Sequence, residues 1–362
     1  MGSDRAPIPE VAGALRAAEL HGSALTITLV GDASRLEAEL ARASSVSART
    51  ARNPLRRAAD RAPTDEAPVD SAHDLAARRR ARDRITIVHA PDVITMHDHP
   101  GQAFRSKPNS SMRRAVDLVA AGEGDAVISA GNSGAMLAAS IFVLGRLPNV
   151  ERPAIVTVLP TPSGPLTLCD AGANVEPKPS QLAQFGVLGA AYDRIVHARP
   201  RPRLGLLSNG AEPGKGTALT RDAHALLTAA QGPFQYIGYV EGSDLFRGVV
   251  DVVATDGFTG NVVLKTCEGI AEGLFGLVRQ ELTTTRRARV GASLVAPALR
   301  DLAKRIDYSE IGGALLAGVA RPAVLAHGRS DATAIASAIA AAAQFAERAL
   351  PTQLATSLGV LA

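Results

Sequence analysis

Residues Val250–Gly269 read VDVVATDGFTGNVVLKTCEG, and this stretch decides the fold that the sequence predicts. Its opening valines, together with Val249, form a short β-branched run, which is typical of a strand buried on both faces. Asp256 stands at the carboxyl end of that run. Asn261 is a favourable N-cap, so we expect a helix that begins at Val262.

A glycine-rich loop separates the predicted strand from the predicted helix. Backbone N–H groups and the positive end of a helix dipole would meet there, near Gly260 and Asn261. Lys265, one turn into the helix, would add a full positive charge. The stretch therefore predicts an anion site, although an ordinary βα turn remains the alternative interpretation.

Other stretches have the same form, an apolar run followed by a loop of Gly, Asn or Asp. They are Gly124–Met136 (GDAVISAGNSGAM), Leu166–Asn174 (LTLCDAGAN) and Leu204–Gly216 (LGLLSNGAEPGKG). A shorter run near the carboxyl terminus ends at His327, for which a structural role is the alternative. Because the carboxyl ends of parallel strands meet at one edge of a sheet, we expect a single ligand site at that edge.

The alternation of strand and helix patterns predicts an α/β fold with a mostly parallel, doubly wound sheet covered on both faces. We expect residues 1–362 to form one domain. Within it, residues 44–84 are rich in Arg, Ala, Ser, Pro and Asp and predict a low-complexity insertion, disordered or loosely helical. Residues 270–306 predict a protruding amphipathic helical hairpin with a basic turn.

The predicted hairpin has several possible uses. It could pack a dimer, lie on an anionic membrane surface or dock an acidic protein. Packing within the domain is the plain alternative. Of these uses, the pattern favours a dimer.

Composition narrows the class of protein. The net charge is +4, Trp is absent and aromatic residues make up 3%, so no stacking surface for nucleic acid is expected. Cys169 and Cys267 follow no metal or redox spacing, which indicates a reducing cytosol. No signal peptide, membrane span, metal-ligand cluster or cofactor motif is recognised.

The few lysines also carry information. They are Lys107, Lys178, Lys215, Lys265 and Lys304, in a chain otherwise rich in Arg. The first four lie in or beside the Gly/Pro loops. A compact ammonium suits a crowded phosphate better than a guanidinium does, so Lys107, Lys215 and Lys265 are candidate phosphate ligands. Chance retention on solvated loops is the alternative.

Several segments together resemble one family. They are SAGNSGAM, ERPAIVTVLP, DAGANVEPKP, GLLSNGAEPGKG, EGSDLFRGVVDVVATDGFTGNVVLKTCEG, YSEIGGALLAGV and HAPDVITMHDHP. They resemble the bacterial phosphate acyltransferases that make acyl-phosphate from acyl-acyl carrier protein for phospholipid synthesis. The resemblance implies a Rossmann-like fold similar to phosphotransacetylases and isocitrate-type dehydrogenases. It also implies a cytoplasmic homodimer, peripherally bound to the inner face of the membrane, that needs no cofactor.

Two departures from the family pattern stand out. The family opens with a strand that ends in D-A-M-G-G-D, of which Met1–Asp4 match only the end. The usual N-I-G-E-E is Ser208–Glu212 here, with Ala211 in place of one acidic residue. The sequence therefore predicts a sheet without that first strand, and one acidic group fewer.

The resemblance implies that inorganic phosphate attacks the thioester of an acyl chain on acyl carrier protein. The chemistry needs positioning and charge stabilisation more than a covalent intermediate. The predicted catalytic residues are Lys265, Asp256, Asn261 and His327, the last as proton donor to the leaving thiolate. The predicted substrate-binding residues are Asn132, Ser133, Gly134, Lys107, Asp170, Asn174, Lys215 and Gly260. The product would pass to a membrane glycerol-3-phosphate acyltransferase.

Other functions also fit these patterns. A phosphate acetyl- or butyryltransferase acting on acyl-coenzyme A shares the same chemistry. A nicotinamide-dependent dehydrogenase is disfavoured, because the G-x-G-x-x-G turn with its downstream acid is missing. An inactive membrane-surface scaffold is the non-enzyme alternative, suggested by the lost strand and by Ala211.

Overall fold

The structure, a computed structural model, describes residues 2–45, 72–212, 214–306 and 312–358. Its main element is an eight-stranded sheet in the order β3-β10-β9-β4-β5-β8-β6-β7. The strands are β3 (Val127–Ser129), β4 (Ala154–Thr161), β5 (Gly164–Cys169), β6 (Arg203–Leu207), β7 (Gln235–Val240), β8 (Val252–Ala254), β9 (Ala314–Ala317) and β10 (Ala323–Leu325). Four of the seven neighbouring pairs are parallel, and the antiparallel pairs all involve β4 or β9. The predicted α/β class with a mostly parallel sheet is confirmed.

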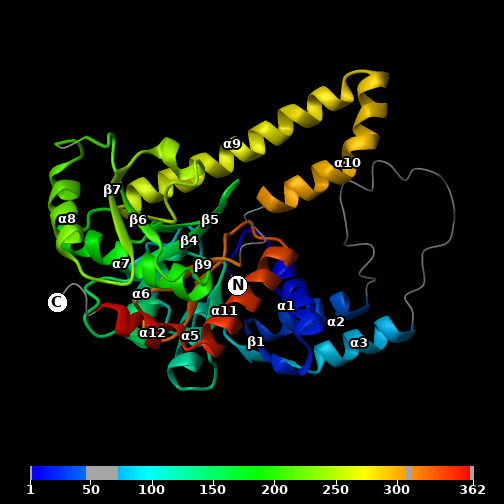
Figure 1. Cartoon of the computed structure of the whole chain (residues 1–362). Coiled ribbons are helices and arrows are strands. Elements are labelled where there is room, and N and C mark those ends of the chain that lie inside the picture. Colours follow the sequence, from blue (N-terminus) through cyan, green and yellow to red (C-terminus); the bar gives the residue numbers. More distant parts are fainter. Residues whose placement is uncertain (1, 46–71, 213, 307–311, 359–362) are drawn as a thin grey trace.

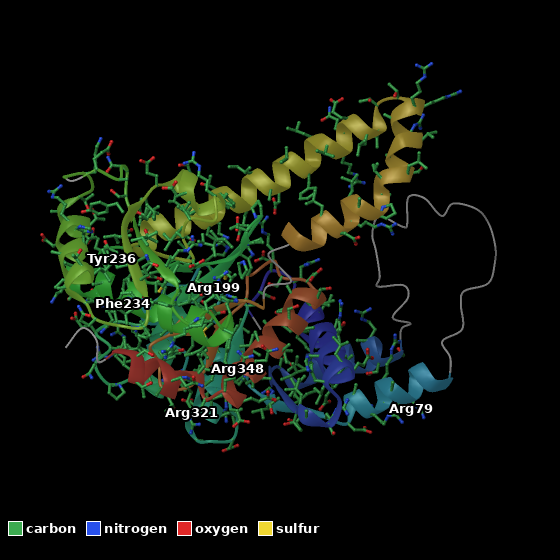
Figure 2. The ribbon with its side chains drawn as sticks, viewed as in Figure 1. Arg79, Arg199, Phe234, Tyr236, Arg321 and Arg348 are labelled. Atoms are coloured by element: carbon green, nitrogen blue, oxygen red, sulfur yellow. The ribbon has the colours of Figure 1, made fainter. Side chains whose placement is uncertain are left out.

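Helices cover both faces of this sheet (Figure 1). They are α1 (Ile8–His21), α2 (Ala33–Ser45), α3 (Ala72–Arg82), α4 (Pro100–Ser106), α5 (Ser111–Ala120), α6 (Ser133–Ala139), α7 (Pro179–Val196), α8 (Ala218–Ala229), α9 (Gly257–Thr283), α10 (Arg286–Ile306), α11 (Ala332–Glu347) and α12 (Leu350–Ser357). Arg348, at the end of α11, donates to the carbonyl of Ile195 on α7 at 2.9 Å, which ties these two helices together (Figure 2).

Two hydrophobic cores lie on the two faces of the sheet, and the strands feed them alternately. On β8, Val252 and Ala254 belong to the core that contains α7 and α11, whereas Val253 belongs to the core that contains α5 and α6. All three side chains are fully buried. The valine run is therefore apolar throughout because both of its faces are covered.

A second, smaller sheet stands beside the first. It consists of β1 (Ile27–Gly31) and β2 (Ile85–His89), which pair in parallel. Among the strands that the structure describes, β1 has no neighbour other than β2, and β3 has none other than β10. The strands are thus divided between two sheets, and β1 and β3 are each an edge strand of their sheet.

The helices α9 and α10 reach away from the body and are joined by Thr284 and Thr285 (Figure 1). The helix α9 runs without a break from the predicted anion site into the hairpin, so this one helix connects the site to the hairpin. Apolar side chains along both helices face outwards, and Leu294 is 78% exposed. The hairpin thus presents an uncovered amphipathic surface.

The predicted insertion lies only partly within the described residues. Residues 46–71 fall outside them. The part from Ala72 to Arg82 is the helix α3, which contacts α1. Arg78 is buried there beside Glu19, at 3.5 Å, and Ala81 is fully buried. This end of the segment is therefore a packed helix and not a solvated linker.

Candidate functional site

The helix α9 begins at Gly257, five residues earlier than predicted. Its N-cap is Asp256, whose carboxylate accepts the backbone N–H of Thr259 at 2.8 Å and the hydroxyl of the same residue at 2.7 Å. The prediction that Asn261 caps this helix is therefore wrong. The Asp256 carboxylate accepts two hydrogen bonds from Thr259, three residues later, and this makes Asp256 the N-cap. Asn261 then lies inside the helix.

The first turn of α9 is packed against the loop that follows β5. The N–H of Gly257 donates to the carbonyl of Asn174 at 2.7 Å, and the N–H of Gly260 donates to Asp256 at 2.9 Å. A Cβ at Gly260 would lie only 1.9 Å from the carbonyl oxygen of Asp170. Gly260 is thus needed for a close approach of two backbones, and its N–H is already bonded within the protein.

Asp170 organises that loop from the inside. Its buried carboxylate accepts N–H groups from Ile155 at 2.9 Å, Gly172 at 3.1 Å and Asn174 at 2.7 Å, among others. The side-chain amide of Asn174 donates to the same carboxylate at 2.9 Å. Burial raises the pKa of Asp170, although these hydrogen bonds oppose the shift. Asp170 and Asn174 are therefore committed to the protein scaffold.

The second predicted anion loop lies at the start of α6. Asn132 caps this helix by accepting the N–H of Ala135 at 3.0 Å, and its amide donates to the carbonyls of Thr95 and Asp98. Gly134 packs against Pro100, where a Cβ would lie 2.8 Å from the proline ring. Asn132 therefore fixes the loop.

The predicted phosphate ligand Lys107 is engaged elsewhere. Its Nζ donates to Asp98 at 2.7 Å and to the carbonyl of Val93 at 3.0 Å. This ammonium, with the N–H of Thr95, lowers the pKa of Asp98 to about 2. The lysine is thus paired and closes the loop between β2 and α4.

Lys215 lies in the loop between β6 and α8. It is exposed, and the loop is closed by the bond from the Gly216 N–H to the side chain of Asn209 at 2.9 Å. Lys215 does not line the cavity described below.

A cavity of about 890 Å³ brings four of the predicted site residues together. They are Ser133, Asn261, Lys265 and His327. The other eight, Asp256, Asn132, Gly134, Lys107, Asp170, Asn174, Lys215 and Gly260, do not line it. Several of those eight residues form hydrogen bonds or close contacts that hold the backbone of the loops around the cavity.

Lys265 is the centre of the polar part of the cavity. Its Nζ lies 3.0 Å from Nε2 of His327 and 2.8 Å from a carboxylate oxygen of Glu268. Sequence reasoning missed Glu268, which also lines the cavity. Its position three residues after Lys265 on a helix is the signal that could have found it.

His327 lies beside this lysine at the exposed rim of the cavity. Burial, followed by the charge of Lys265, lowers the pKa of His327, while the charge of Glu268 opposes the shift. Its Nδ1 accepts the backbone N–H of Arg329 at 3.1 Å. In a neutral imidazole the ring proton then resides on Nε2, the nitrogen that faces Lys265.

Apolar side chains line a further part of the cavity, beside polar ones such as Thr157, Glu272 and Asp331. Leu264, Ala271 and Phe275 of α9 face Ile155 and Val158 of β4 there. Among the described residues, no cluster of three or more His, Cys, Asp or Glu side chains could hold a metal ion. In the same part of the chain, no helix has the length and apolar character required to cross a bilayer.

Comparison with known proteins agrees with the motifs. Residues 66–353 match the family described as "Fatty acid synthesis protein". A relative from Syntrophotalea carbinolica, named phosphate acyltransferase, is 42% identical over 360 residues, which cover 99% of this chain and 92% of the relative. The chain belongs to the phosphate acyltransferase family. A phosphate acyltransferase from Myxococcus xanthus is 46% identical over 301 residues, 82% of this chain and 83% of the relative.

Solved structures of two other acyltransferases share the fold of this phosphate acyltransferase family member. A phosphotransacetylase from Staphylococcus aureus has a TM-score of 0.50 at 14% identity and covers 93% of this chain and 99% of its own. A branched-chain phosphotransacylase from Enterococcus faecalis V583 also has a TM-score of 0.50, at 15% identity, with 91% and 99% covered. These likenesses confirm the predicted similarity of fold to phosphotransacetylases.

Proposed function

We propose that the chain transfers a long-chain acyl group from acyl-acyl carrier protein to inorganic phosphate, giving acyl-phosphate for phospholipid synthesis. The relatives named phosphate acyltransferase support this assignment of activity. The observation that carries it is the 3.0 Å contact between Lys265 and His327 in a cavity that also has apolar lining residues along α9 and β4. Such a cavity offers a place for an anion beside a place for an acyl chain.

Two hydrogen-bond donors converge where these residues meet. The ammonium of Lys265 can only donate, and Nε2 of neutral His327 can accept from it only when the ring proton lies on Nδ1, the nitrogen that faces the N–H of Arg329. An oxygen of phosphate, or of the thioester as it becomes an oxyanion, would accept from both. This unmet need for an acceptor supports a phosphate or oxyanion position at Lys265.

The proposed reaction is a single acyl transfer. A phosphate oxygen forms a bond to the thioester carbon, the carbon–sulfur bond breaks, and the thiolate of the carrier leaves with a proton. Lys265 would stabilise the negative charge, Asn261 and Ser133 would help to place the substrate, and His327 would supply the proton. Asp256, through its cap, would hold the first turn of α9 in place for Lys265.

The apolar part of the cavity supports a long acyl chain. It runs from Lys265 along α9 past Ala271 and Phe275 and reaches Ala303 on α10. A long acyl chain along this path would bury apolar surface, and each Å² removed from water stabilises the complex by about 25 cal/mol. A short acyl group on coenzyme A would leave most of that path unfilled.

We propose that the hairpin serves the partners of the reaction. The hairpin carries exposed apolar residues such as Leu277 and Leu294, and its turn is basic at Arg286 and Arg287. Such a surface suits a second copy of the chain or an anionic membrane surface. On this proposal the protein is a cytoplasmic homodimer at the inner face of the membrane. It receives acyl carrier protein there and passes acyl-phosphate to a membrane glycerol-3-phosphate acyltransferase.

The deciding experiment measures thiol release from palmitoyl-acyl carrier protein with and without inorganic phosphate. We expect release that depends on phosphate, with the acyl-phosphate trapped by hydroxylamine as a hydroxamate. Activity on short acyl-coenzyme A alone would favour the phosphate acetyl- or butyryltransferase. Release from neither thioester, by a chain shown to be folded, would contradict the proposal.

A further inference from the structure

The face of α9 that lines the cavity at Lys265 has a regular pattern. Spacings of three and four residues recur along it, which place the lining residues on one side of the helix. The next positions on this face, Arg279 and Leu282, do not line the cavity. The part of the cavity that follows α9 therefore ends at Phe275. The lining residues of this helix are Asn261, Leu264, Lys265, Glu268, Ala271, Glu272 and Phe275.

This lining face has an apolar edge and a charged edge. Each residue of a helix is rotated by about 100° from the one before it. Leu264, Ala271 and Phe275 therefore fall on one edge of the face, whereas Lys265 and Glu272 fall on the other. An alkyl chain bound along the apolar edge would run beside the ammonium of Lys265 at its start.

The residues of the apolar edge differ in size. Ala271 leaves room for an alkyl chain, and Phe275 ends the edge with an aromatic ring. Phe275 is partly buried, although Leu274 and Leu277 on the same helix are 60% and 62% exposed. The ring of Phe275 therefore turns towards the cavity and not towards the solvent, so it closes the far end of the apolar edge.

The helix also gives the length of this path. Phe275 lies ten residues after Lys265, which corresponds to about 15 Å at a rise of about 1.5 Å per residue. An extended alkyl chain advances about 1.25 Å per carbon, because bonds of about 1.52 Å meet at about 111°. The path from Lys265 to the ring of Phe275 therefore holds about twelve carbons.

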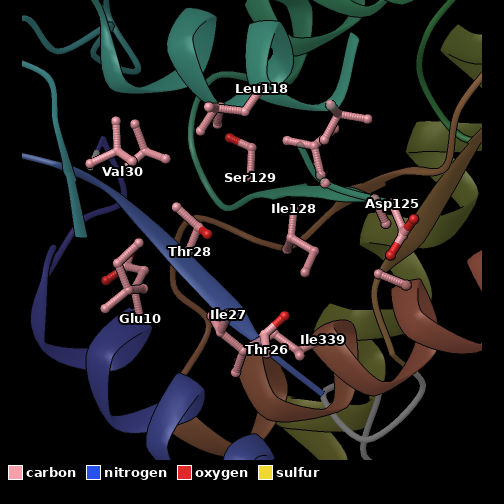
Figure 3. Close-up of a pocket in the computed structure, with 18 of the residues that line it drawn as sticks. Glu10, Thr26, Ile27, Thr28, Val30, Leu118, Asp125, Ile128, Ser129 and Ile339 are labelled. Carbon is pink, nitrogen blue, oxygen red and sulfur yellow. The ribbon is translucent and has the colours of Figure 1, made fainter. Parts of the chain in front are cut away.

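A second cavity is less suited to an alkyl chain. It has a volume of about 730 Å³, lies between the edge strands β1 and β3, and shares only Gly131 with the cavity at Lys265 (Figure 3). Residues 24–30 and 123–131 line it without interruption, so strand backbone borders it. Backbone N–H and C=O groups require hydrogen-bond partners, which an alkyl chain does not supply. The backbone of α9 is instead bonded within the helix.

We propose that Phe275 determines which acyl chain lengths the enzyme favours. The thioester lies at Lys265, the acyl chain follows Leu264 and Ala271, and its end meets the ring of Phe275. This inference rests on the proposed acyl transfer and adds the residue that sets its specificity. Up to about twelve carbons, each added methylene is buried and raises kcat/KM by up to about fourfold. Further carbons bend away from the path and add little.

The test measures phosphate-dependent thiol release from saturated acyl-acyl carrier proteins, from octanoyl to palmitoyl. For the unaltered protein we expect kcat/KM to rise with acyl length and to level off at about twelve carbons. In Phe275→Ala the ring is lost, and the apolar Val278 and Leu282 continue the edge beyond it. The ratio of kcat/KM for palmitoyl to that for dodecanoyl should therefore rise at least about tenfold.

A second variant should move the end of the path in the opposite direction. Ala271 lies six residues after Lys265, about 9 Å along the helix, so the ring in Ala271→Phe leaves room for about seven carbons. The ratio of kcat/KM for dodecanoyl to that for octanoyl should then fall at least about tenfold. The matched control is Phe258→Ala, which removes a ring that is 62% exposed on α9 and does not line the cavity. Both ratios should stay unchanged in it.

A binding measurement separates this inference from the proposed reaction. The probes are free saturated fatty acids of the same lengths, whose carboxylate takes the place of the thioester at Lys265. Their Kd values, measured by calorimetry, should level off at the same acyl lengths as kcat/KM and shift in the same directions in the two variants. A folded protein that shows these shifts in Kd but releases no thiol would refute the acyl transfer and still support Phe275 as the end of the path.

Two results would overturn the inference. One is a levelling-off at the same acyl length in Phe275→Ala, in Ala271→Phe and in the unaltered protein. The other is an equal loss at every acyl length in both variants, which would indicate damage to the fold and not a limit on length. Phosphate-dependent release together with either result would leave the acyl transfer intact and refute only the role of Phe275.

Discussion

The Nζ of Lys265 lies 3.0 Å from Nε2 of His327, although the two residues are 62 positions apart in the chain. The contact arises because α9 leaves the end of β8 and passes β5 and β4, while His327 directly follows β10 on the far side of β4. Glu268, one helical turn after Lys265, holds the same ammonium from the other side. A cation, a neutral imidazole and a carboxylate thus meet at one point of the cavity.

Removing the ammonium at this point tests its role in turnover. We expect Lys265→Ala to lower phosphate-dependent thiol release at least about tenfold, because a donor to a developing charge in a partly enclosed site is lost. The free energy of unfolding should change little, since the side chain is exposed enough to be replaced by water. The measurement is steady-state turnover together with urea unfolding of both proteins.

The matched control removes a positive charge at the amino end of β10, the end opposite to His327. Arg321 is exposed at the amino end of that strand, and Arg321→Ala should keep normal turnover. Near-normal turnover in Lys265→Ala would remove this lysine from the site. Loss of turnover in Lys215→Ala but not in Lys265→Ala would move the phosphate position to the loop after β6.

The titration of His327 reports on its neighbours. We expect its pKa to lie below the ordinary value of 6.5, because burial and the charge of Lys265 both disfavour the imidazolium. Lys265→Met should raise this pKa, and Glu268→Gln should lower it further. The pKa values can be followed by NMR of the imidazole ring, and shifts of the same sign in both variants would contradict the arrangement.

The same shift has a consequence for stability. Because the folded pKa of His327 lies below the unfolded one, the unfolded chain binds more protons between the two values. The contribution of His327 to stability is therefore fully present above about pH 6.5 and is lost as the pH falls. A His327→Asn variant should lose less stability than the parent over that acid range.

Much of the site could be predicted from local patterns. The valines before Asp256 indicate a strand buried on both faces, and β8 is such a strand. The Gly-Asn-Ser loop predicts a helix start, and Asn132 caps α6. The first two features depend on short-range chemistry. The expectation that all the strand ends meet at one sheet edge was wrong, because β10 runs in the opposite direction to β8. Lys265 reaches His327 because α9 crosses β5 and β4.

Other features depend on partners that are distant in sequence. Nothing around Lys107 indicates that Asp98 would neutralise it, since the pairing requires the fold of the intervening loop. Asp256 and Asn261 are both good caps, and the choice was decided by the packing of Gly257 against Asn174. The division into two sheets also depends on long-range strand order, which local patterns do not encode.

The buried carboxylate of Asp170 provides a test of the scaffold. In Asp170→Asn one oxygen becomes an NH₂ group that faces N–H donors, such as those of Ile155 or Asn174. We expect a loss of about 3 kcal/mol in the free energy of unfolding, measured in urea. Asp222→Asn, exposed on α8, should change it by less than about 0.5 kcal/mol. Equal values for the two variants would mean that the network contributes nothing.

Two glycines of α9 should respond to the same substitution in opposite directions. A Cβ at Gly260 would lie 1.9 Å from the backbone oxygen of Asp170, so Gly260→Ala must push the helix off the loop after β5. We expect a loss of about 3 kcal/mol. At Gly273, further along α9, a Cβ meets nothing within 4 Å, and Gly273→Ala should stabilise the protein by about 1 kcal/mol through helix propensity. Thermal unfolding of the two variants gives both signs, and stabilisation by Gly260→Ala would refute the close approach of α9 to Asp170.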